Sequence, residues 1–169
     1  MRSVVTGGAG FLGSHLVELL LKRGDEVVVL DDESTGRPEN LTHVTDHPQL
    51  DYRVGSILDR AAVRNAVAGA DRVFHLAAAV GVRRIVEHPL DGLRTNIHGT
   101  ENVLDACVEN ASRLLLVSTS EIYGKNTADA LSEDADRILG SPLVARWTYA
   151  AAKGIDEAFA HAYIQEFGL

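Results

Sequence analysis

The chain is poor in cysteine, in positive charge and in long apolar runs. Cys107 is the only cysteine among 169 residues, so no intrachain disulfide can form and a reducing compartment is expected. The formal net charge of −8 argues against a surface that binds nucleic acid or an anionic membrane. No segment reaches the roughly 18 apolar residues that span a bilayer, and the N-terminus lacks a signal-peptide pattern. We therefore expect a cytoplasmic protein.

Histidines are present, but their spacing does not suit a metal site. His43 and His47 stand four apart, yet Pro48 indicates an irregular segment and no third ligand follows at metal spacing. We therefore expect no metal. Three further histidines occur singly in strand or helix patterns and are expected to be structural: His75, His98 and His161.

Short apolar runs alternate with longer segments of helical periodicity. Strands are expected at Ser3–Thr6, Glu26–Leu30, Tyr52–Val54, Arg72–Leu76 and Leu114–Val117. Helices are expected at Phe11–Lys22, Ala61–Val67, Leu93–Asn110 and Thr148–Phe167. This alternation predicts one α/β domain over residues 1–169, with a doubly wound, Rossmann-type parallel sheet. Its ligand crevice should lie at the carboxyl ends of the strands, where the polar loop Lys125–Pro142 could cover it.

The first predicted strand leads into Gly7-Gly8-Ala9-Gly10-Phe11-Leu12-Gly13, and the second ends in Asp31-Asp32. A glycine turn that opens a helix favours a pyrophosphate, and Gly10 lets the backbone approach it. Asp31, about twenty residues past the glycines, can accept hydrogen bonds from the adenosine ribose hydroxyls. Because its carboxylate would repel a 2′-phosphate, the pattern predicts a dinucleotide site that prefers NAD to NADP.

Tyr149 and Lys153 stand four residues apart on the last predicted helix, so the phenol and the ammonium share one face. A nearby ammonium and a cationic nicotinamide would both stabilise a phenolate, which makes the pair a candidate base. Such pairs also occur on many solvated helix faces. The dinucleotide pattern upstream favours the chemical interpretation, because a hydride acceptor needs a partner that removes the hydroxyl proton.

The block Val117-Ser118-Thr119-Ser120-Glu121-Ile122-Tyr123-Gly124 follows the fifth predicted strand. Together with the motifs above, it makes the chain resemble the extended short-chain dehydrogenase/reductase family. The resemblance is to its NAD-dependent branch of nucleotide-sugar epimerases, dehydratases and decarboxylases. It extends over essentially all of the chain and includes Ser34-Thr35-Gly36, His75-Leu76-Ala77-Ala78 and Asn96-Ile97-His98-Gly99-Thr100.

The resemblance implies a role for each matching residue. Thr119 would hydrogen-bond the sugar 4-hydroxyl, Tyr149 would remove its proton, and Lys153 would bind the nicotinamide ribose while lowering the tyrosine pKa. Asp31 would bind the adenosine ribose, and Asn96 would support the local geometry. The remaining cofactor contacts implied are Gly7, Gly10, Phe11 and Leu12 at the pyrophosphate, Leu76, Ala77 and Ala78 along the middle of the cofactor, and Asp32, Thr35, Gly36, Ser56 and Ile57.

Two positions matter for the reaction and for affinity. Ser56 stands where the family usually has an aspartate that touches adenine, which predicts somewhat weaker binding of the cofactor. Glu121 is a C5 base in the dehydratases that the chain resembles, but Ser120 replaces the neighbouring acid of the best-known 4,6-dehydratases. The block also resembles UDP-glucuronate decarboxylases and GDP-mannose dehydratases. Glu121 is alternatively a residue that only orients the loop. We expect a UDP-glucose-type 4-epimerase, with a dehydratase, a decarboxylase or an NAD-binding module without turnover as alternatives.

Members of this family usually run to about twice this length. We therefore expect the chain to lack the C-terminal domain that holds the nucleotide sugar, and to retain most of the cofactor site. The resemblance also implies a homodimer, formed by packing the helices at 93–110 and 148–167 into a four-helix bundle. Ala158 and Ala162 would permit close packing there.

Overall fold

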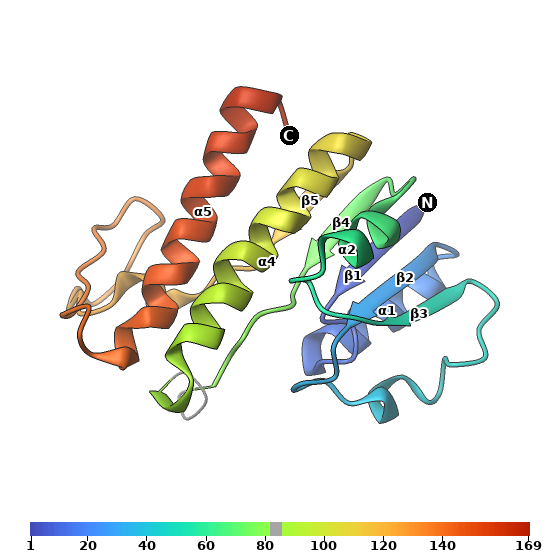
Figure 1. The fold of residues 1–169 in the computed structure, drawn as a ribbon, viewed down its shortest axis with the longest axis horizontal. Helices are drawn as coiled ribbons and strands as arrows, with labels where there is room; N and C mark the ends of the chain where they lie inside the picture. Colours follow the sequence, from blue (N-terminus) through green and yellow to red (C-terminus); the bar gives the residue numbers. More distant parts are fainter. Residues whose placement is uncertain (82–85) are drawn as a thin grey trace.

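A computed structural model describes residues 1–81 and 86–169 of the chain. Five strands form one parallel sheet in the order β3-β2-β1-β4-β5, which confirms the predicted doubly wound, Rossmann-type sheet (Figure 1). The strands are β1 (Arg2–Thr6), β2 (Glu26–Asp31), β3 (Leu50–Val54), β4 (Arg72–His75) and β5 (Arg113–Leu116).

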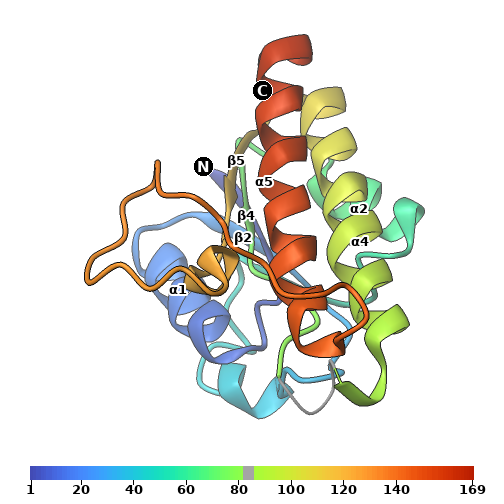
Figure 2. The same ribbon diagram turned by 90° about the vertical axis from the view of Figure 1, so that its left-hand side faces the viewer.

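Helices cover both faces of the sheet (Figure 2). They are α1 (Phe11–Lys22), α2 (Arg60–Val67), α4 (Pro89–Asn110) and α5 (Thr148–Phe167), with short 3₁₀ turns η1 (Pro38–Leu41), η2 (Ser120–Tyr123) and η3 (Ala145–Trp147). Helix α1 packs on one face through Val17 and Leu20, against Val5 and Val29 of the strands. Helices α2 and α4 cover the other face, and α5 lies against α4. Within the described ranges, no helix is long and apolar enough to cross a membrane.

The helix starts show why some predicted boundaries shift. Helix α4 begins at Pro89, four residues before the predicted Leu93, because proline at a first helical position loses no hydrogen bond. Helix α2 begins at Arg60, after Asp59, whose carboxylate caps it by accepting the amides of Ala61 and Ala62.

The strands differ in burial according to their place in the sheet. The side chains of Val4, Val5 and Val28 are fully buried in the central strands β1 and β2. Strand β5 is at the sheet edge, where Leu115 is 51% exposed. Because all four pairings are parallel, the strands end on the same side of the sheet. The glycine turn, Asp31 and the segment after β5 meet at these carboxyl ends.

Candidate dinucleotide and catalytic site

A cavity of about 390 Å³ opens at the carboxyl ends of the strands, where the sequence predicts a ligand crevice. We call it the strand-end cavity. Most of the predicted cofactor residues line it: Gly7, Gly10, Phe11, Leu12, Asp31, Asp32, Thr35, Gly36, Ile57, Leu76, Ala77, Ala78, Tyr149 and Lys153. No residue of the Lys125–Pro142 loop belongs to this lining, so the structure does not place that loop over the cavity.

The glycine loop is shaped by backbone approaches that leave no room for side chains. Gly7 has φ of +71°, and a Cβ there would lie 2.8 Å from the Ala77 amide nitrogen. A Cβ at Gly13 would lie 2.2 Å from the Gly7 carbonyl oxygen, so α1 packs directly on the turn. The amide of Gly10 donates to the Gly7 carbonyl (3.1 Å). Phe11 and Leu12, 76% and 64% exposed, place the first turn of α1 at the cavity wall.

Asp31 is held by two backbone amides. Its Oδ2 accepts from the Ala9 amide (2.9 Å) and its Oδ1 from the Glu33 amide (2.8 Å), while the residue is only 5% exposed. A Cβ at Gly36 would lie 2.8 Å from Oδ1, so the Ser34-Thr35-Gly36 turn closes over this carboxylate. Each carboxylate oxygen can accept one more hydrogen bond, so Asp31, which lines the cavity, could bind both hydroxyls of a ribose.

Replacing Asp31 with Asn tests whether this charge excludes a 2′-phosphate. We expect the ratio of NADP affinity to NAD affinity to rise by about tenfold, because repulsion of the extra phosphate is lost. Calorimetric titration with both dinucleotides measures the ratio. Asp32→Asn is the matched control, since its carboxylate accepts the Ser34 amide and it is expected to change the ratio less. An unchanged ratio in D31N would show that Asp31 does not select the dinucleotide.

Tyr149 and Lys153 reach the strand-end cavity from the first turns of α5. Burial raises the pKa of Tyr149, a hydrogen bond with Thr119 opposes that rise, and the charges of Glu121 and Asp156 add to it. The expectation that Lys153 lowers this pKa differs from the structure. The Lys153 ammonium instead donates to Asp156 Oδ2 at 3.0 Å, in an ion pair that is almost fully buried.

Thr119 and Glu121 do not line the strand-end cavity. The Thr119 hydroxyl accepts the Glu121 amide (3.3 Å) as it caps η2. Both carboxylate oxygens of Glu121 accept from Arg146, at 2.5 and 3.1 Å, and the guanidinium lies over the Trp147 ring at 5.4 Å. Glu121 is therefore held by a bidentate partner that the sequence analysis did not identify.

Two further predicted positions have structural contacts. Ser56 lies outside the cavity lining, and its hydroxyl accepts the Leu58 amide at 3.2 Å, whereas its neighbours Gly55 and Ile57 do line the cavity. Asn96 exchanges two hydrogen bonds with the Ala79 backbone, at 2.7 and 3.3 Å, which confirms its predicted supporting role.

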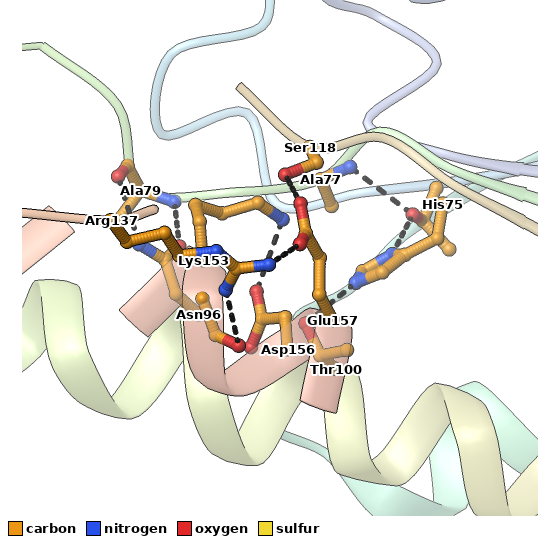
Figure 3. Close-up of polar contacts among 12 residues, drawn as sticks. His75, Ala77, Ala79, Asn96, Thr100, Ser118, Arg137, Lys153, Asp156 and Glu157 are labelled. Atoms are coloured by element: carbon orange, nitrogen blue, oxygen red, sulfur yellow. Dashed lines mark hydrogen bonds and ion pairs between the residues drawn. The ribbon is translucent and has the colours of Figure 1, made fainter. Parts of the chain in front are cut away.

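A chain of buried polar side chains joins β1, β4 and α4 through His75 (Figure 3). The Thr6 hydroxyl contacts His75 Nδ1 (2.7 Å), and His75 Nε2 contacts the Thr100 hydroxyl (3.1 Å). Because the Ala77 amide donates to Thr6 Oγ1 at 3.2 Å, the Thr6 hydroxyl proton is free for the ring. Burial and the charge of Lys153 lower the pKa of His75 to about 3, so this histidine is neutral and structural, as predicted.

Several site residues were missed by the sequence analysis. Gly13, Thr95 and Ser118 line the cavity but were given no ligand role. Thr95 directly precedes the motif that begins at Asn96, and Ser118 lies within the block that follows the fifth strand. Their positions in the sequence could therefore have indicated a place in the site. Asp156 was also missed, although an acid three residues after Lys153 on a mostly apolar helix is visible in the sequence. In residues 1–81 and 86–169, no group of three or more potential ligands could hold a metal ion.

The comparisons with known proteins agree with this geometry. A family model described as GDP-mannose 4,6 dehydratase matches residues 4–169. The chain belongs to this family. Membership of the GDP-mannose 4,6 dehydratase family confirms the resemblance to extended short-chain dehydrogenases/reductases that the motifs indicated.

Similar family proteins differ in their reactions. A UDP-N-acetyl-alpha-D-glucosaminuronate decarboxylase of Bacillus cytotoxicus is 39% identical over 96% of this chain and 50% of its own length. The dTDP-glucose 4,6-dehydratase of Streptomyces venezuelae, solved with NAD, has a TM-score of 0.90 and 34% identity over 100% of this chain and 53% of its own. The UDP-glucose 4-epimerase of Thermotoga maritima, solved with UDP-glucose, has a TM-score of 0.87 and 30% identity over 100% and 53%. The chain thus spans about half the length of these relatives.

Proposed function

We propose that this chain is the NAD-binding half of an enzyme that oxidises the 4-hydroxyl of a nucleotide sugar, in a UDP-glucose-type 4-epimerase. The observation that carries the proposal is that Tyr149 and Lys153 line the same cavity as the glycine loop and Asp31. A dinucleotide fits the cavity because the glycine loop leaves room for a pyrophosphate and Asp31 presents acceptors for a ribose. NAD, when bound, supplies the acceptor and donor of the hydride.

The chain's own residues would perform the proton transfer. The Tyr149 side chain, as the phenolate, would take the proton of the sugar hydroxyl and become the neutral phenol, and the Thr119 hydroxyl, which is hydrogen-bonded to Tyr149, would orient both groups. The Lys153 ammonium stands at the cavity wall, where it can donate to a ribose hydroxyl. In the return direction, the neutral Tyr149 phenol would give the proton back to the sugar oxygen.

The contacts of Glu121 favour epimerisation over dehydration. A 4,6-dehydratase needs a base at C5, but both oxygens of Glu121 are engaged by Arg146. Ser120 also supplies no carboxylic acid for a departing 6-hydroxyl. A 4-epimerase needs neither group, because the same tyrosine serves both directions.

Decarboxylation is the second candidate function, because decarboxylases are among the similar proteins. Curated relatives of this chain include decarboxylases of UDP-sugar acids from Bacillus cytotoxicus, Arabidopsis thaliana and Danio rerio. Oxidation at C4 of a uronate gives a β-keto acid, which loses carbon dioxide without a base at C5. The residues required of this chain are therefore the same as for the epimerase.

Product analysis tests the proposal. The longest form of the protein that carries this chain is incubated with NAD and either UDP-glucose or UDP-glucuronate, and the products are identified by proton NMR. Formation of the 4-epimer of UDP-glucose supports the epimerase. A UDP-pentose with carbon dioxide identifies the decarboxylase, a 4-keto-6-deoxy sugar identifies the dehydratase, and no turnover of either substrate contradicts the first proposal.

We further propose a homodimer formed through the α4 and α5 faces. The two helices pack against each other, and α5 leaves Ile155 and Ile164 42% and 53% exposed. Ala158 is exposed and Ala162 partly buried on the same helix, as close packing of a second helix pair requires. Sedimentation of the chain with and without Ile155→Glu tests this assembly: a single monomeric species in both would contradict it.

A further inference from the structure

Lys153 has a buried acidic partner whose role the proposed reaction does not explain. Asp156 lies three residues further along α5, and its Oδ2 accepts from the Lys153 ammonium at 3.0 Å (Figure 3). The side chains of Lys153 and Asp156 are 4% and 0% exposed. The interaction is therefore an ion pair in the interior of the protein, and its Lys153 member lines the strand-end cavity.

Such a pair is poorly explained by stability alone. Removing two charges from water costs several kcal/mol per ion, and apolar side chains of similar volume often serve the fold equally well. Burial raises the pKa of Asp156, while Lys153 and the Thr100 hydroxyl oppose that rise. No hydrogen bond of good geometry reaches Asp156 Oδ1 within the described part of the chain. The carboxylate is thus committed mainly to Lys153.

The other groups around the ammonium do not replace Asp156. His75, from β4, is neutral, and α4 contributes the uncharged Thr100 hydroxyl, which contacts both that ring and Asp156. Tyr149, one turn earlier on α5, carries a neutral phenol because burial raises its pKa. Glu157 is the next residue, but its carboxylate is turned to Ser118 and Arg137 (Figure 3).

We propose that Asp156 is a positioning residue that keeps the buried Lys153 side chain charged and fixed at the cavity wall for the nicotinamide ribose. This inference rests on the proposed function, since it assumes that NAD occupies the strand-end cavity. Without Asp156, burial would favour the uncharged amine, which is a weaker donor. The charge of Lys153, and with it NAD binding, would then be lost at a lower pH.

The Lys153 titration can be read directly, because the chain has only three lysines: Lys22, Lys125 and Lys153. Lysine is labelled with ¹³C at Cε, and the Lys153 resonance is assigned as the one missing from Lys153→Met. In Asp156→Asn, we expect the Lys153 midpoint to fall by at least about one pH unit, with Lys22 and Lys125 unchanged. Asp25→Asn is the matched control, since Asp25 is 6% exposed and pairs with Arg72 at the amino ends of the strands, away from the strand-end cavity.

NAD affinity provides a second measurement that separates positioning from a general effect on the fold. In D156N, NAD should bind about fivefold more weakly at pH 7, and the deficit should widen toward pH 9. In a K153M background, the same substitution should change NAD affinity by less than about twofold, because the group it acts on is gone. If D156N does not fold, Asp156→Ser removes the same charge and leaves space for a water.

An unchanged Lys153 midpoint would overturn the proposal. A pH-independent loss of NAD affinity that persists in the K153M background would also overturn it, because Asp156 would then only support the fold. Neither measurement involves a sugar. If D156N shows the expected Lys153 titration and NAD affinity but the protein turns over no sugar, the result counts against the proposed function alone.

Discussion

Replacing Tyr149 with Phe is expected to lower turnover by at least about 10³-fold while changing NAD affinity by less than about threefold. The substitution removes one hydroxyl from a half-buried ring that lines the strand-end cavity, so the shape of the site is kept. General acid–base groups typically contribute 10²- to 10⁴-fold, and this tyrosine would act in both directions of the cycle. Product formation from UDP-glucose, followed by NMR, gives the rate, and calorimetry gives the NAD affinity.

The pH dependence of the wild-type rate provides an independent check on Tyr149. Its pKa is raised in the ligand-free protein, so the phenolate fraction grows as the pH increases from 7 to 9. Turnover should therefore rise over that interval, and any residual rate of Y149F should not follow the same curve. Tyr163→Phe is the matched control on α5, because that phenol donates to Asp105 at 2.7 Å, outside the cavity lining. Wild-type rates in Y149F would remove the tyrosine from the mechanism.

The arrangement of the fold was predictable because each strand carries its own signal. Val27, Val28 and Val29 form a continuous apolar run, as expected for a strand buried on both faces of a parallel sheet. The crossover rule then places the helices on both sides, without any knowledge of tertiary contacts. Boundaries were less predictable where side chains are polar: α4 extends back to Pro89 through a segment that has little apolar periodicity.

For the candidate site, the sequence predicts where the backbone elements meet, but it does not predict which charged side chains pair with each other. The glycine spacing and Asp31 were enough to predict one wall of the strand-end cavity. A glycine turn, a helix N-terminus and the end of a strand must meet at the carboxyl ends of a parallel sheet. The partners of Lys153 and Glu121 depend on which rotamers the folded chain selects. Asp156 accepts a hydrogen bond from the Lys153 ammonium, and Arg146 donates to the Glu121 carboxylate. Four-residue spacing places Tyr149 and Lys153 on one helix face, but it does not indicate a third group that competes for the charge.

Replacing Gly13 with Ala is expected to destabilise the chain by about 2 to 3 kcal/mol and to weaken NAD binding at least about tenfold. The new Cβ would lie 2.2 Å from the Gly7 carbonyl oxygen and 2.8 Å from Gly8 Cα. Both atoms belong to the backbone, so no side-chain rotation can relieve the overlap, and α1 must move away from the turn. Thermal unfolding and calorimetric titration with NAD measure the two effects.

Gly92→Ala supplies the matched control, because Gly92 also lies inside a helix but a Cβ there would meet nothing within 4 Å. Alanine is the better helix former, so this variant should gain about 0.5 to 1 kcal/mol and bind NAD normally. The opposite signs separate the helix propensity of alanine from the steric overlap at the turn. If G13A were as stable as the wild type and bound NAD equally well, the contact between α1 and Gly7 would not shape the pyrophosphate site, and that role would fall to Gly7 and Gly10 alone.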